Sequence, residues 1–383
     1  MIVILVISIL VFGLYAIYPI FLKVFCSSRA EYNAKTNPIQ EVSLILLTYN
    51  GRRYLADKID FLLKELAHFE KYELIIIDDK SKDGTEKLLD EFLQNDKIKL
   101  VSKGAHTGIP ASMNLGVKNA RYDNIVFCDQ RQRLSENSLQ KIVEPLQYAE
   151  VGAVSGCLSS LDKDNNDSLI RRHENEIKCN ESKSGNLIGV YGPFYAIKKN
   201  CYSFLPNHII LDDLYLSLKI LKSKFVVIAS GCMMTDDNFS RLYNYSRVKR
   251  YLKGLAQLLF EKNLIGDLSG RQRTMLLWHK YSRLLIPLLS FVGYLFVGYN
   301  IYRGPGYFIA FSLISLLGLG ALFENYYKFT SKYLSVVRIN ILYLIAMFDL
   351  LLGGFLSHLN IHFDKSRFRL KNKKETIQSK VHY

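Results

Sequence analysis

Hydrophobic residues follow different patterns in the middle of this chain and at its ends. Between residues 41 and 240, short apolar runs alternate with segments whose apolar residues recur every three or four positions. The runs predict buried strands, and the spaced segments predict amphipathic helices. The predicted strands are residues 42–47, 74–77, 98–101, 125–128 and 225–228, and the predicted helices are 54–69, 85–94, 110–120, 135–148 and 213–222. This alternation predicts an α/β domain with a Rossmann-like, doubly wound, mostly parallel sheet.

The N-terminal segment is long enough to cross a membrane. Residues 2–22 carry no charged side chain, and a helix needs about 20 apolar residues to span the hydrocarbon core. A cleaved signal peptide is the alternative. No basic segment precedes the apolar run, however, and Lys23, Cys26 and Arg29 follow it in place of a small-residue cleavage site. We therefore expect a transmembrane anchor at residues 1–25.

Three further apolar blocks lie near the C-terminus, at residues 284–302, 307–323 and 334–356. Each is long enough to span a bilayer. A tight turn with two glycines and a proline separates the first two blocks, so we expect them to form a helical hairpin. The third block carries Arg338 and Asp349 and is the candidate for lying in the interface or re-entering. The number of spans stays open.

Composition and charge narrow the class of protein. A hydrophobic content of 49% excludes a disordered or collagen-like chain. Lys and Arg number 50 against 35 Asp and Glu, which gives a net charge of +15. Basic segments beside anionic lipid account for this excess, so membrane lipid is an expected partner and nucleic acid is not. The six cysteines show no metal-ligand spacing, which indicates a reduced, cytosol-facing middle domain.

Polar residues collect where three of the predicted strands end. Thr48, Tyr49 and Asn50 follow the first strand, an acidic segment at 78–85 follows the second, and residues 129–132 follow the fourth. Ligands of such sheets bind outside the carboxyl ends of the strands, so these side chains predict a binding site. Taken singly, each group is also ordinary turn and helix-cap chemistry.

The motifs at these positions resemble a known family. The runs VSLILLTYN and LIIIDDKSKDGT, with a later strand that ends in Asp129, are similar to the inverting glycosyltransferases of family 2, which have a GT-A fold. The resemblance continues in VGAVSG, VYGPFYAIKK and LDDLYLSLKI and covers about residues 40–255. The apolar ends resemble the membrane-anchored branch of this family, which includes cellulose, chitin and hyaluronan synthases.

The resemblance implies a nucleotide-diphosphate sugar as donor, with uridine as the expected base. It assigns Thr48, Tyr49 and Asn50 to the nucleobase. Asp79 takes the position of an acid that accepts hydrogen bonds from the base or ribose, since a carboxylate accepts through both oxygens.

The resemblance also implies a divalent metal, Mg²⁺ or Mn²⁺, held by an Asp-x-Asp pair. Asp129 matches the first acid, but Arg131 stands in place of the second. One carboxylate can still join a metal shell completed by water and phosphate oxygens. Arg131 can contact phosphate directly through its planar fork, or it can form a structural salt bridge, and both interpretations stay open.

Asp212 and Asp213 match the catalytic acids of the family, with Asp213 in the position of the general base. A carboxylate that accepts the proton of an attacking hydroxyl suits an inverting displacement. Helix capping is the alternative role for this pair, although two acids exceed what a cap needs. The loop residues expected to shape the acceptor cleft are Gly189, Tyr191, Gly192 and Pro193.

Arg247, Arg250 and Tyr251 resemble the Q-x-x-R-W segment of processive members, with Arg in place of Gln and Tyr in place of Trp. The resemblance places Arg250 at the diphosphate of the leaving nucleotide. A basic amphipathic helix at anionic lipid is the alternative, and one helix can serve both roles.

Together these features predict transfer of a sugar, with inversion, to a lipid-linked or growing saccharide at the cytosolic face of the plasma membrane. The alternative is a catalytically silent nucleotide-sugar-binding module of a polysaccharide assembly complex. A channel with a regulatory domain is disfavoured, because the C-terminal blocks have few polar residues. The expected divisions are an anchor at 1–25, a GT-A domain at 38–240, a basic interface segment at 241–281, transmembrane or interfacial helices at 282–358 and a basic tail at 359–383.

Overall fold

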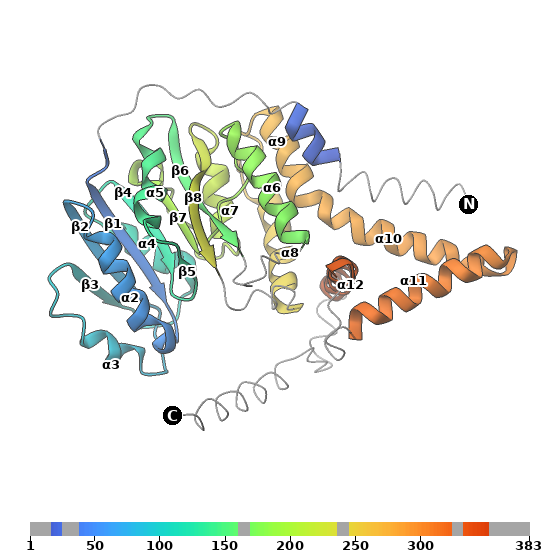
Figure 1. The fold of residues 1–383 in the computed structure, drawn as a ribbon, viewed down its shortest axis with the longest axis horizontal. Coiled ribbons are helices and arrows are strands. Elements are labelled where there is room, and N and C mark those ends of the chain that lie inside the picture. The colour runs from blue at the N-terminus through green and yellow to red at the C-terminus, as the bar shows by residue number, and fades with distance from the viewer. Residues whose placement is uncertain (1–16, 25–37, 160–168, 236–244, 324–331, 352–383) are drawn as a thin grey trace.

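A mixed sheet forms the centre of the protein in the computed structural model (Figure 1). The structure describes residues 17–24, 38–159, 169–235, 245–323 and 332–351. The eight strands of the sheet lie in the order β3-β2-β1-β4-β7-β6-β8-β5. They are β1 (Glu41–Thr48), β2 (Lys71–Asp78), β3 (Ile98–Ser102), β4 (Asn124–Asp129), β5 (Arg133–Leu134), β6 (Val151–Ser159), β7 (Phe194–Lys198) and β8 (Phe225–Thr235).

The first half of the sheet is the parallel arrangement that the sequence predicts. Strands β3, β2, β1 and β4 pair in parallel, and all five predicted strands form. The second half is mixed, because β7 runs antiparallel to both β4 and β6, while β6 pairs in parallel with β8. The fold is therefore an α/β fold with a parallel-rich sheet, and β5, β6 and β7 are strands that the apolar pattern did not identify.

Helices cover both faces of the sheet and enclose two hydrophobic cores. Val42, Leu44 and Leu46 of β1 point into one core with α2, α3 and α5, whereas Ile45 points into the other with α4, α6 and α7. This alternation follows from the two-residue period of a strand. The helices are α2 (Arg52–Leu66), α3 (Thr85–Asp90), α4 (Ile109–Asn119), α5 (Ser138–Val143), α6 (Leu169–Lys183) and α7 (Asp212–Ile220), with 3-10 turns at Glu144–Gln147 and Lys199–Cys201.

The described residues from 245 onward form helices joined by turns. They comprise α8 (Tyr245–Phe260), α9 (Gly270–Leu276), a π-helical turn at Leu277–Tyr281, α10 (Ser282–Tyr299), a 3-10 turn at Ile301–Arg303, α11 (Pro305–Phe323) and α12 (Lys332–Leu351). The predicted hairpin is confirmed, since Tyr294 of α10 stacks on Phe311 of α11 with 4.9 Å between ring centroids. The hydroxyls of Tyr294 and Ser315 lie 3.2 Å apart across the same contact.

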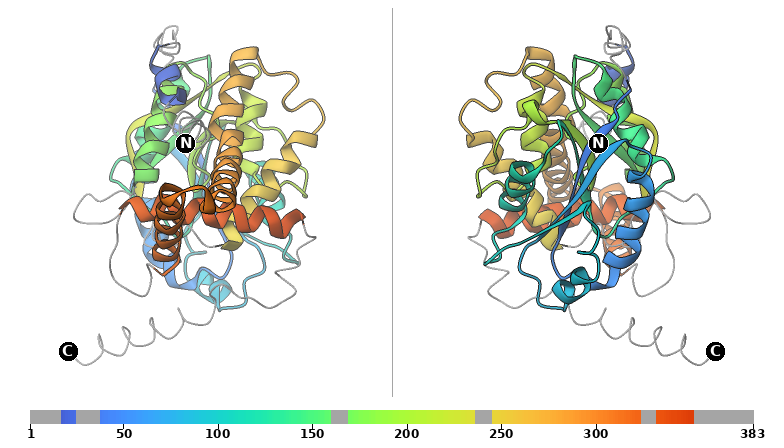
Figure 2. Two further views of the ribbon diagram at one scale, coloured as in Figure 1. Left: turned by 90° about the vertical axis from the view of Figure 1, so that its right-hand side faces the viewer. Right: turned by 90° about the vertical axis from the view of Figure 1, so that its left-hand side faces the viewer.

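Helix α12 crosses the hairpin instead of extending it. Figure 1 shows α12 end-on while α10 and α11 run across the view. In the left view of Figure 2, α12 runs across the view and α10 and α11 point toward the viewer. Asp349 of α12 is fully buried, accepts a hydrogen bond from Tyr245 at 2.5 Å and forms an ion pair with Lys249. The polar residue that set this block apart in the sequence thus joins α12 to α8.

Two observations bear on the predicted membrane segments. Within the described ranges, no single helix is both long and apolar enough to cross a membrane, whereas the bent pair Gly270–Tyr281 and Leu284–Tyr299, with 49° between its parts, passes by length and composition. Residues 17–24 are helical, and Tyr18 among them donates a hydrogen bond to Glu181 of α6 at 2.5 Å. The rest of the predicted anchor, the end of the third apolar block and the basic tail lie outside the described residues.

The start of α5 generates a stability prediction. Asn137 precedes α5 with φ 57° and supplies no side-chain cap. The buried carboxylate of Glu65 accepts from the N–H groups of Asn137 and Leu139 at 2.8 and 3.1 Å instead. Glu65→Ala leaves these donors unpaired, at a cost of about 1–3 kcal/mol each. We expect its apparent unfolding temperature to fall by several degrees, while the exposed control Glu70→Ala melts like the native protein. Equal melting of both variants would contradict this role.

Candidate active site

The carboxyl ends of β1, β2 and β4 lie level with one another. Thr48 pairs with Asp78 across β1 and β2, and Leu47 pairs with Asp129 across β1 and β4. Gln130 joins two of these ends, because its side chain accepts a hydrogen bond from the Thr48 hydroxyl and donates one to the Tyr49 carbonyl at 3.1 Å. The register of the sheet therefore places the predicted polar groups along one edge.

The segment after β1 forms one wall of this edge. The Tyr49 side chain is 40% exposed, and its ring centroid lies 4.3 Å from that of His106 at an interplanar angle of 31°. Asn50 adopts a left-handed φ of 50°, and its side-chain oxygen accepts from the Lys82 N–H at 2.8 Å. The left-handed turn thus exposes an aromatic face beside the loop that follows β2.

Asp79 holds a second loop in place. Its side chain is 8% exposed, and its carboxylate accepts hydrogen bonds from the N–H groups of Thr107 and Gly108, both at 2.9 Å. Lys103 and His106 lie 2.6 and 2.8 Å from the same carboxylate. Burial opposes its ionisation, but the hydrogen bonds from Lys103 and the two N–H groups outweigh burial and lower the pKa of Asp79. Protein donors thus already contact both oxygens, and base or ribose recognition by Asp79 stays a prediction.

A group of acids lies where β4 ends and α7 begins. Asp129, Asp213 and Arg250 are close enough for their charges to act on Asp212. Withdrawal from water, and after it the charge of Asp213, raises the pKa of Asp212 to about 7, although Arg250 opposes the shift. Arg250 also donates to the Ile210 carbonyl at 3.2 Å, which fixes α8 beside the start of α7. Three acids and the arginine that the sequence predicts are therefore brought together.

The loop at residues 189–193 contacts both the end of β4, which carries Asp129, and the start of α7, which carries Asp213. The N–H of Asp129 donates to the Pro193 carbonyl at 2.9 Å. A Cβ atom on Gly192 would lie 3.2 Å from an oxygen of Asp213, so only glycine leaves that carboxylate uncrowded on this side. Asp213 also accepts from the N–H of Leu214 at 2.8 Å. The expected acceptor loop thus lies directly against the predicted base.

Tyr195 of β7 supplies a buried polar atom that the site leaves unused. Its side chain is 2% exposed, and its hydroxyl has no hydrogen-bond partner among the residues that the structure describes. Burial, and after it the charge of Asp212, raises the pKa of this phenol, which therefore keeps its proton. The hydroxyl lies within electrostatic reach of Asp129 and Asp213 as well. It is a donor held ready beside the acids.

The donor set fits a metal shared with substrate better than an all-protein cage. In the parts of the chain that are described, no three His, Cys, Asp or Glu side chains are arranged to hold a metal ion. Mg²⁺ takes six oxygen ligands and commonly keeps waters and substrate phosphates among them. Asp129 at the exit of β4, next to two further acids, fits such a shell with a single protein carboxylate.

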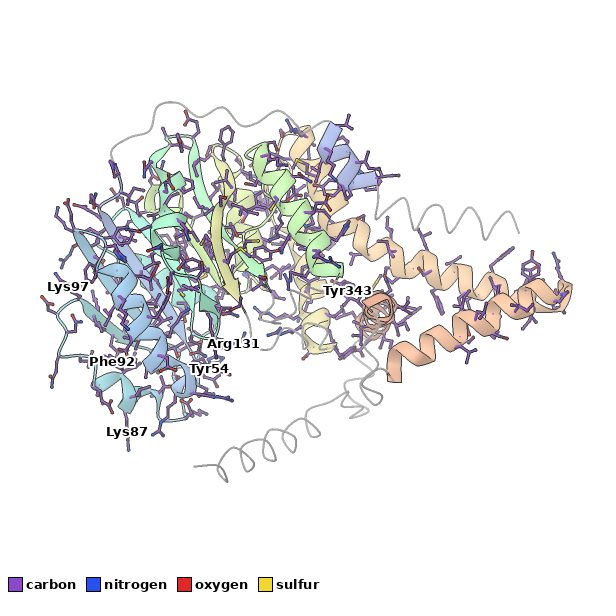
Figure 3. All side chains as sticks on the ribbon, in the orientation of Figure 1. Tyr54, Lys87, Phe92, Lys97, Arg131 and Tyr343 are labelled. Carbon is purple, nitrogen blue, oxygen red and sulfur yellow. The ribbon has the colours of Figure 1, made fainter. Side chains whose placement is uncertain are left out.

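The remaining predicted residues lie around this centre. Figure 3 shows Arg131 at the edge of the sheet where β1 ends, and its side chain is partly buried. Arg247 lies on the first turn of α8 and is partly buried. Tyr251 points toward α12, where its ring meets Tyr343 edge-on at 6.4 Å. The contact of Tyr251 is thus with a C-terminal helix, and its predicted role in nucleotide-sugar binding stays untested.

Several residues at the site were not identified from the sequence. The sequence pattern assigns Gln130 no role apart from its polar neighbours, and nothing in the run VYGPFYAIKK marks Tyr195 as a site residue. Lys103 and His106 bind Asp79 from a loop, and a loop histidine carries little sequence signal. Only the folded positions of β2 and β3 bring these two side chains to the carboxylate.

Comparison with known proteins agrees with this geometry. Residues 43–203 match the sequence model described as Glycosyl transferase family 2. The chain is 22% identical over 227 residues to "Glycosyltransferase GlyG" of Streptococcus pneumoniae, which covers 54% of this chain and 70% of that protein. It is 24% identical over 234 residues to "Poly-beta-1,6-N-acetyl-D-glucosamine synthase" of Staphylococcus epidermidis. That match covers 55% of this chain and 56% of the synthase. The chain thus spans little more than half of that synthase.

A solved structure shares the fold. "Mannosyltransferase PcManGT from Pyrobaculum calidifontis in complex with GDP-Man and Mn2+" superposes with a TM-score of 0.74 at 17% identity. The match covers 91% of this chain and 98% of that one. The GT-A-like fold is therefore confirmed, and the family match supports a family 2 glycosyltransferase.

The raised pKa of Asp212 predicts how stability depends on pH. The folded protein keeps this proton up to about pH 7, whereas an unfolded chain releases it near pH 4. Between these values the folded state binds more protons, so stability falls as pH rises. Asp212→Asn removes this titration. The melting temperature of Asp212→Asn, relative to that of the native protein, should therefore rise by several degrees between about pH 4 and pH 8.

The matched control for this experiment is Asp90→Asn, at the exposed end of α3. It should follow the native protein at every pH. A difference between Asp212→Asn and native that stays constant with pH would contradict the assigned protonation.

Proposed function

We propose that this protein is a membrane-associated, inverting glycosyltransferase that takes a sugar from a nucleotide-diphosphate donor, with uridine as the expected base. The observation that carries the proposal is the pair Asp212 and Asp213 at the start of α7, held beside Asp129 by the loop at 189–193. The family match and the named relatives support sugar transfer.

The reaction is a single displacement at the anomeric carbon. An acceptor hydroxyl bonds to that carbon as the bond to the diphosphate oxygen breaks, so the configuration inverts. Asp213 takes the proton of the hydroxyl, and the electron pair leaves with the diphosphate. Asp213 suits this role because Gly192 leaves space beside its carboxylate.

The leaving diphosphate needs positive charge, which the neighbouring cations supply. Arg250 already acts electrostatically on Asp212 and is exposed on the first turns of α8. Arg131 follows Asp129 at the same sheet edge and can contact phosphate through its planar fork. Asp129 would hold a bound Mg²⁺ or Mn²⁺, which would offset phosphate charge. The mannosyltransferase neighbour was solved with Mn²⁺, which supports testing this metal first.

The nucleoside end of the donor fits the edge at β1 and β2. Tyr49 offers an exposed ring next to His106, and aromatic faces stack on bases. Thr48 and Asn50 fix the backbone around that ring through Gln130 and Lys82. Asp79 acts here by holding the loop at 103–108 against the same edge.

The acceptor is a saccharide or a lipid-linked saccharide, and the helical part supplies the contact with lipid. Apolar side chains project from α10 and α11 with more than half of their surface exposed, among them Leu285, Val292, Leu295, Ile309 and Leu316. Exposed apolar surface of this extent suits a membrane. We place the catalytic domain on the cytosolic face of the plasma membrane, with Arg247 of α8 toward lipid headgroups.

The names of the relatives suggest which sugar to test. The staphylococcal synthases are named for poly-β-1,6-N-acetyl-D-glucosamine, so a uridine-linked N-acetylhexosamine is the first donor to try. The mannosyltransferase neighbour was solved with GDP-Man, which makes a guanosine-linked hexose the second.

One observation favours a second candidate function. Arg131 occupies the position where the family has the second acid of its metal pair. Without that acid, a protein can bind nucleotide-sugar and not turn it over. The alternative is therefore a silent binding module of a polysaccharide assembly complex, and the same assay separates it from an enzyme.

The test is release of nucleoside diphosphate by detergent-solubilised protein, with a donor panel and with Mg²⁺ or Mn²⁺. We expect turnover of one donor and a loss of about 10²- to 10⁴-fold for Asp213→Asn, because a general base contributes that much. Asp213→Asn should still bind the donor. Asp90→Asn, remote on α3, should keep full activity. Donor binding without turnover in the native protein, with saccharide acceptors present, would replace this proposal by the silent module.

A further inference from the structure

A buried lysine lies behind the acceptor loop. Lys178 of α6 is 3% exposed, and its ammonium group donates to the carbonyl of Gly189 at 2.7 Å and to that of Val190 at 3.4 Å. The same nitrogen lies 3.7 Å from the ring centroid of Tyr191. Three consecutive residues of the loop thus surround one cation.

The surroundings of Lys178 are those of a bound cation. An ammonium group has three donors and no acceptor, and here two carbonyls and an aromatic face meet it. Burial, and after it the charge of Lys280, lowers the pKa of Lys178 to about 7. Glu174, Asp213 and Glu181 oppose that shift. Burial therefore disfavours the charged form of Lys178, and the loop carbonyls and these three acids stabilise it.

The loop that Lys178 holds reaches both reacting acids. The N–H of Val190 donates to the Ser217 hydroxyl at 3.1 Å, which donates to the backbone carbonyl of Asp213 at 2.7 Å. Two residues further on, Gly192 faces the Asp213 carboxylate, and the Pro193 carbonyl accepts from Asp129. A shift of Gly189 and Val190 would therefore move the wall next to Asp213.

We propose that Lys178 is a positioning residue for the acceptor: its ammonium group fixes the carbonyls of Gly189 and Val190 so that the loop at 189–193 presents the acceptor hydroxyl to Asp213. This inference rests on the proposed function. Lys178 touches neither donor nor acceptor, and donor binding occurs at the strand ends on the other side of Asp129. Its loss therefore weakens use of the acceptor and spares the donor.

The charged groups around Lys178 come from three elements. Glu174 and Glu181 lie on α6 with it, and Asp213 faces it from α7. Lys280 approaches from the π-helical turn, where the neighbouring His279 bonds to Glu181 at 2.7 Å and to Glu174 at 3.1 Å. Arg171 of α6 is a further cation here, and its guanidinium carbon lies 5.9 Å from the centroid of the Tyr191 ring. As pH rises, loss of the Lys178 proton weakens its hold on the carbonyls and ring.

The test compares Lys178→Met with Lys183→Met, which removes an exposed lysine from the same helix. We expect the acceptor kcat/KM of Lys178→Met to fall about 10- to 100-fold, as for a lost charged hydrogen bond. Donor affinity should stay within about twofold of native. The native acceptor KM should rise above about pH 7, and Lys178→Met should lose this rise while Lys183→Met keeps it.

The proposal would be overturned if Lys178→Met lost donor affinity as much as acceptor kcat/KM, or if its acceptor KM depended on pH as in the native protein. Lys178 would then have a structural role only. Hydrogen–deuterium exchange of residues 187–194 in the substrate-free protein tests the loop without any activity. Those amides should be less protected in Lys178→Met than in Lys183→Met. If Lys178→Met does not fold, the same exchange is measured on the native protein. Protection of these amides, corrected for intrinsic exchange, should fall from about pH 6 to pH 8.5. Unchanged protection would contradict the inference.

This exchange result is independent of the proposed function. If no donor is turned over, the enzyme proposal fails, but the exchange experiment still shows whether Lys178 fixes the loop. If turnover occurs and the loop amides do not respond to Lys178→Met, only the positioning role is lost.

Discussion

Negative charge is concentrated where β4 ends and α7 begins, and the fold holds it there against electrostatic repulsion. Asp212 has a raised pKa because burial and the charge of Asp213 disfavour its ionised form. Backbone contacts keep the acids in place: the Pro193 carbonyl accepts from Asp129, and Gly192 lies against Asp213. Such an arrangement costs stability and is found where a substrate or ion relieves the charge. Arg250, Tyr195 and Lys178 surround the same centre, so the site is built around this one electrostatic constraint.

The pKa of an aspartate is shifted in opposite directions at the two ends of the site. Asp79 is buried among Lys103 and two N–H donors, so its pKa is lowered and its charge serves the loop that it holds. Asp212 is withdrawn from water beside another acid, so it keeps its proton to about neutral pH. The difference lies in the partners that each receives, not in the residue type. At one end of the site the protein's own groups therefore already neutralise the acid, whereas the other end can accept an incoming cation.

The sequence predicted the part of the fold that depends on continuous apolar runs. Strands β1, β2 and β4 and the polar residues after them were identified, because buried parallel strands have no polar face. Strands β6 and β7 were missed as elements: VGAVSGCLS mixes small and polar residues, and FYAIK is short. Helix α6 was missed because its buried face contains Lys178 and Glu181, which break the apolar period. The pairing of Lys103 with Asp79 and of Lys178 with the acceptor loop depends on long-range packing and could not be read from spacing.

The central claim is a single displacement in which an acceptor hydroxyl loses its proton to Asp213. The anomeric configuration of the first product, measured by proton NMR from the coupling constant at the new linkage, tests it most directly. A linkage of configuration opposite to that of the donor sugar agrees with one in-line displacement. A product that retains the donor configuration would require a second displacement or a different mechanism, and it would contradict the assignment of Asp213 as the base.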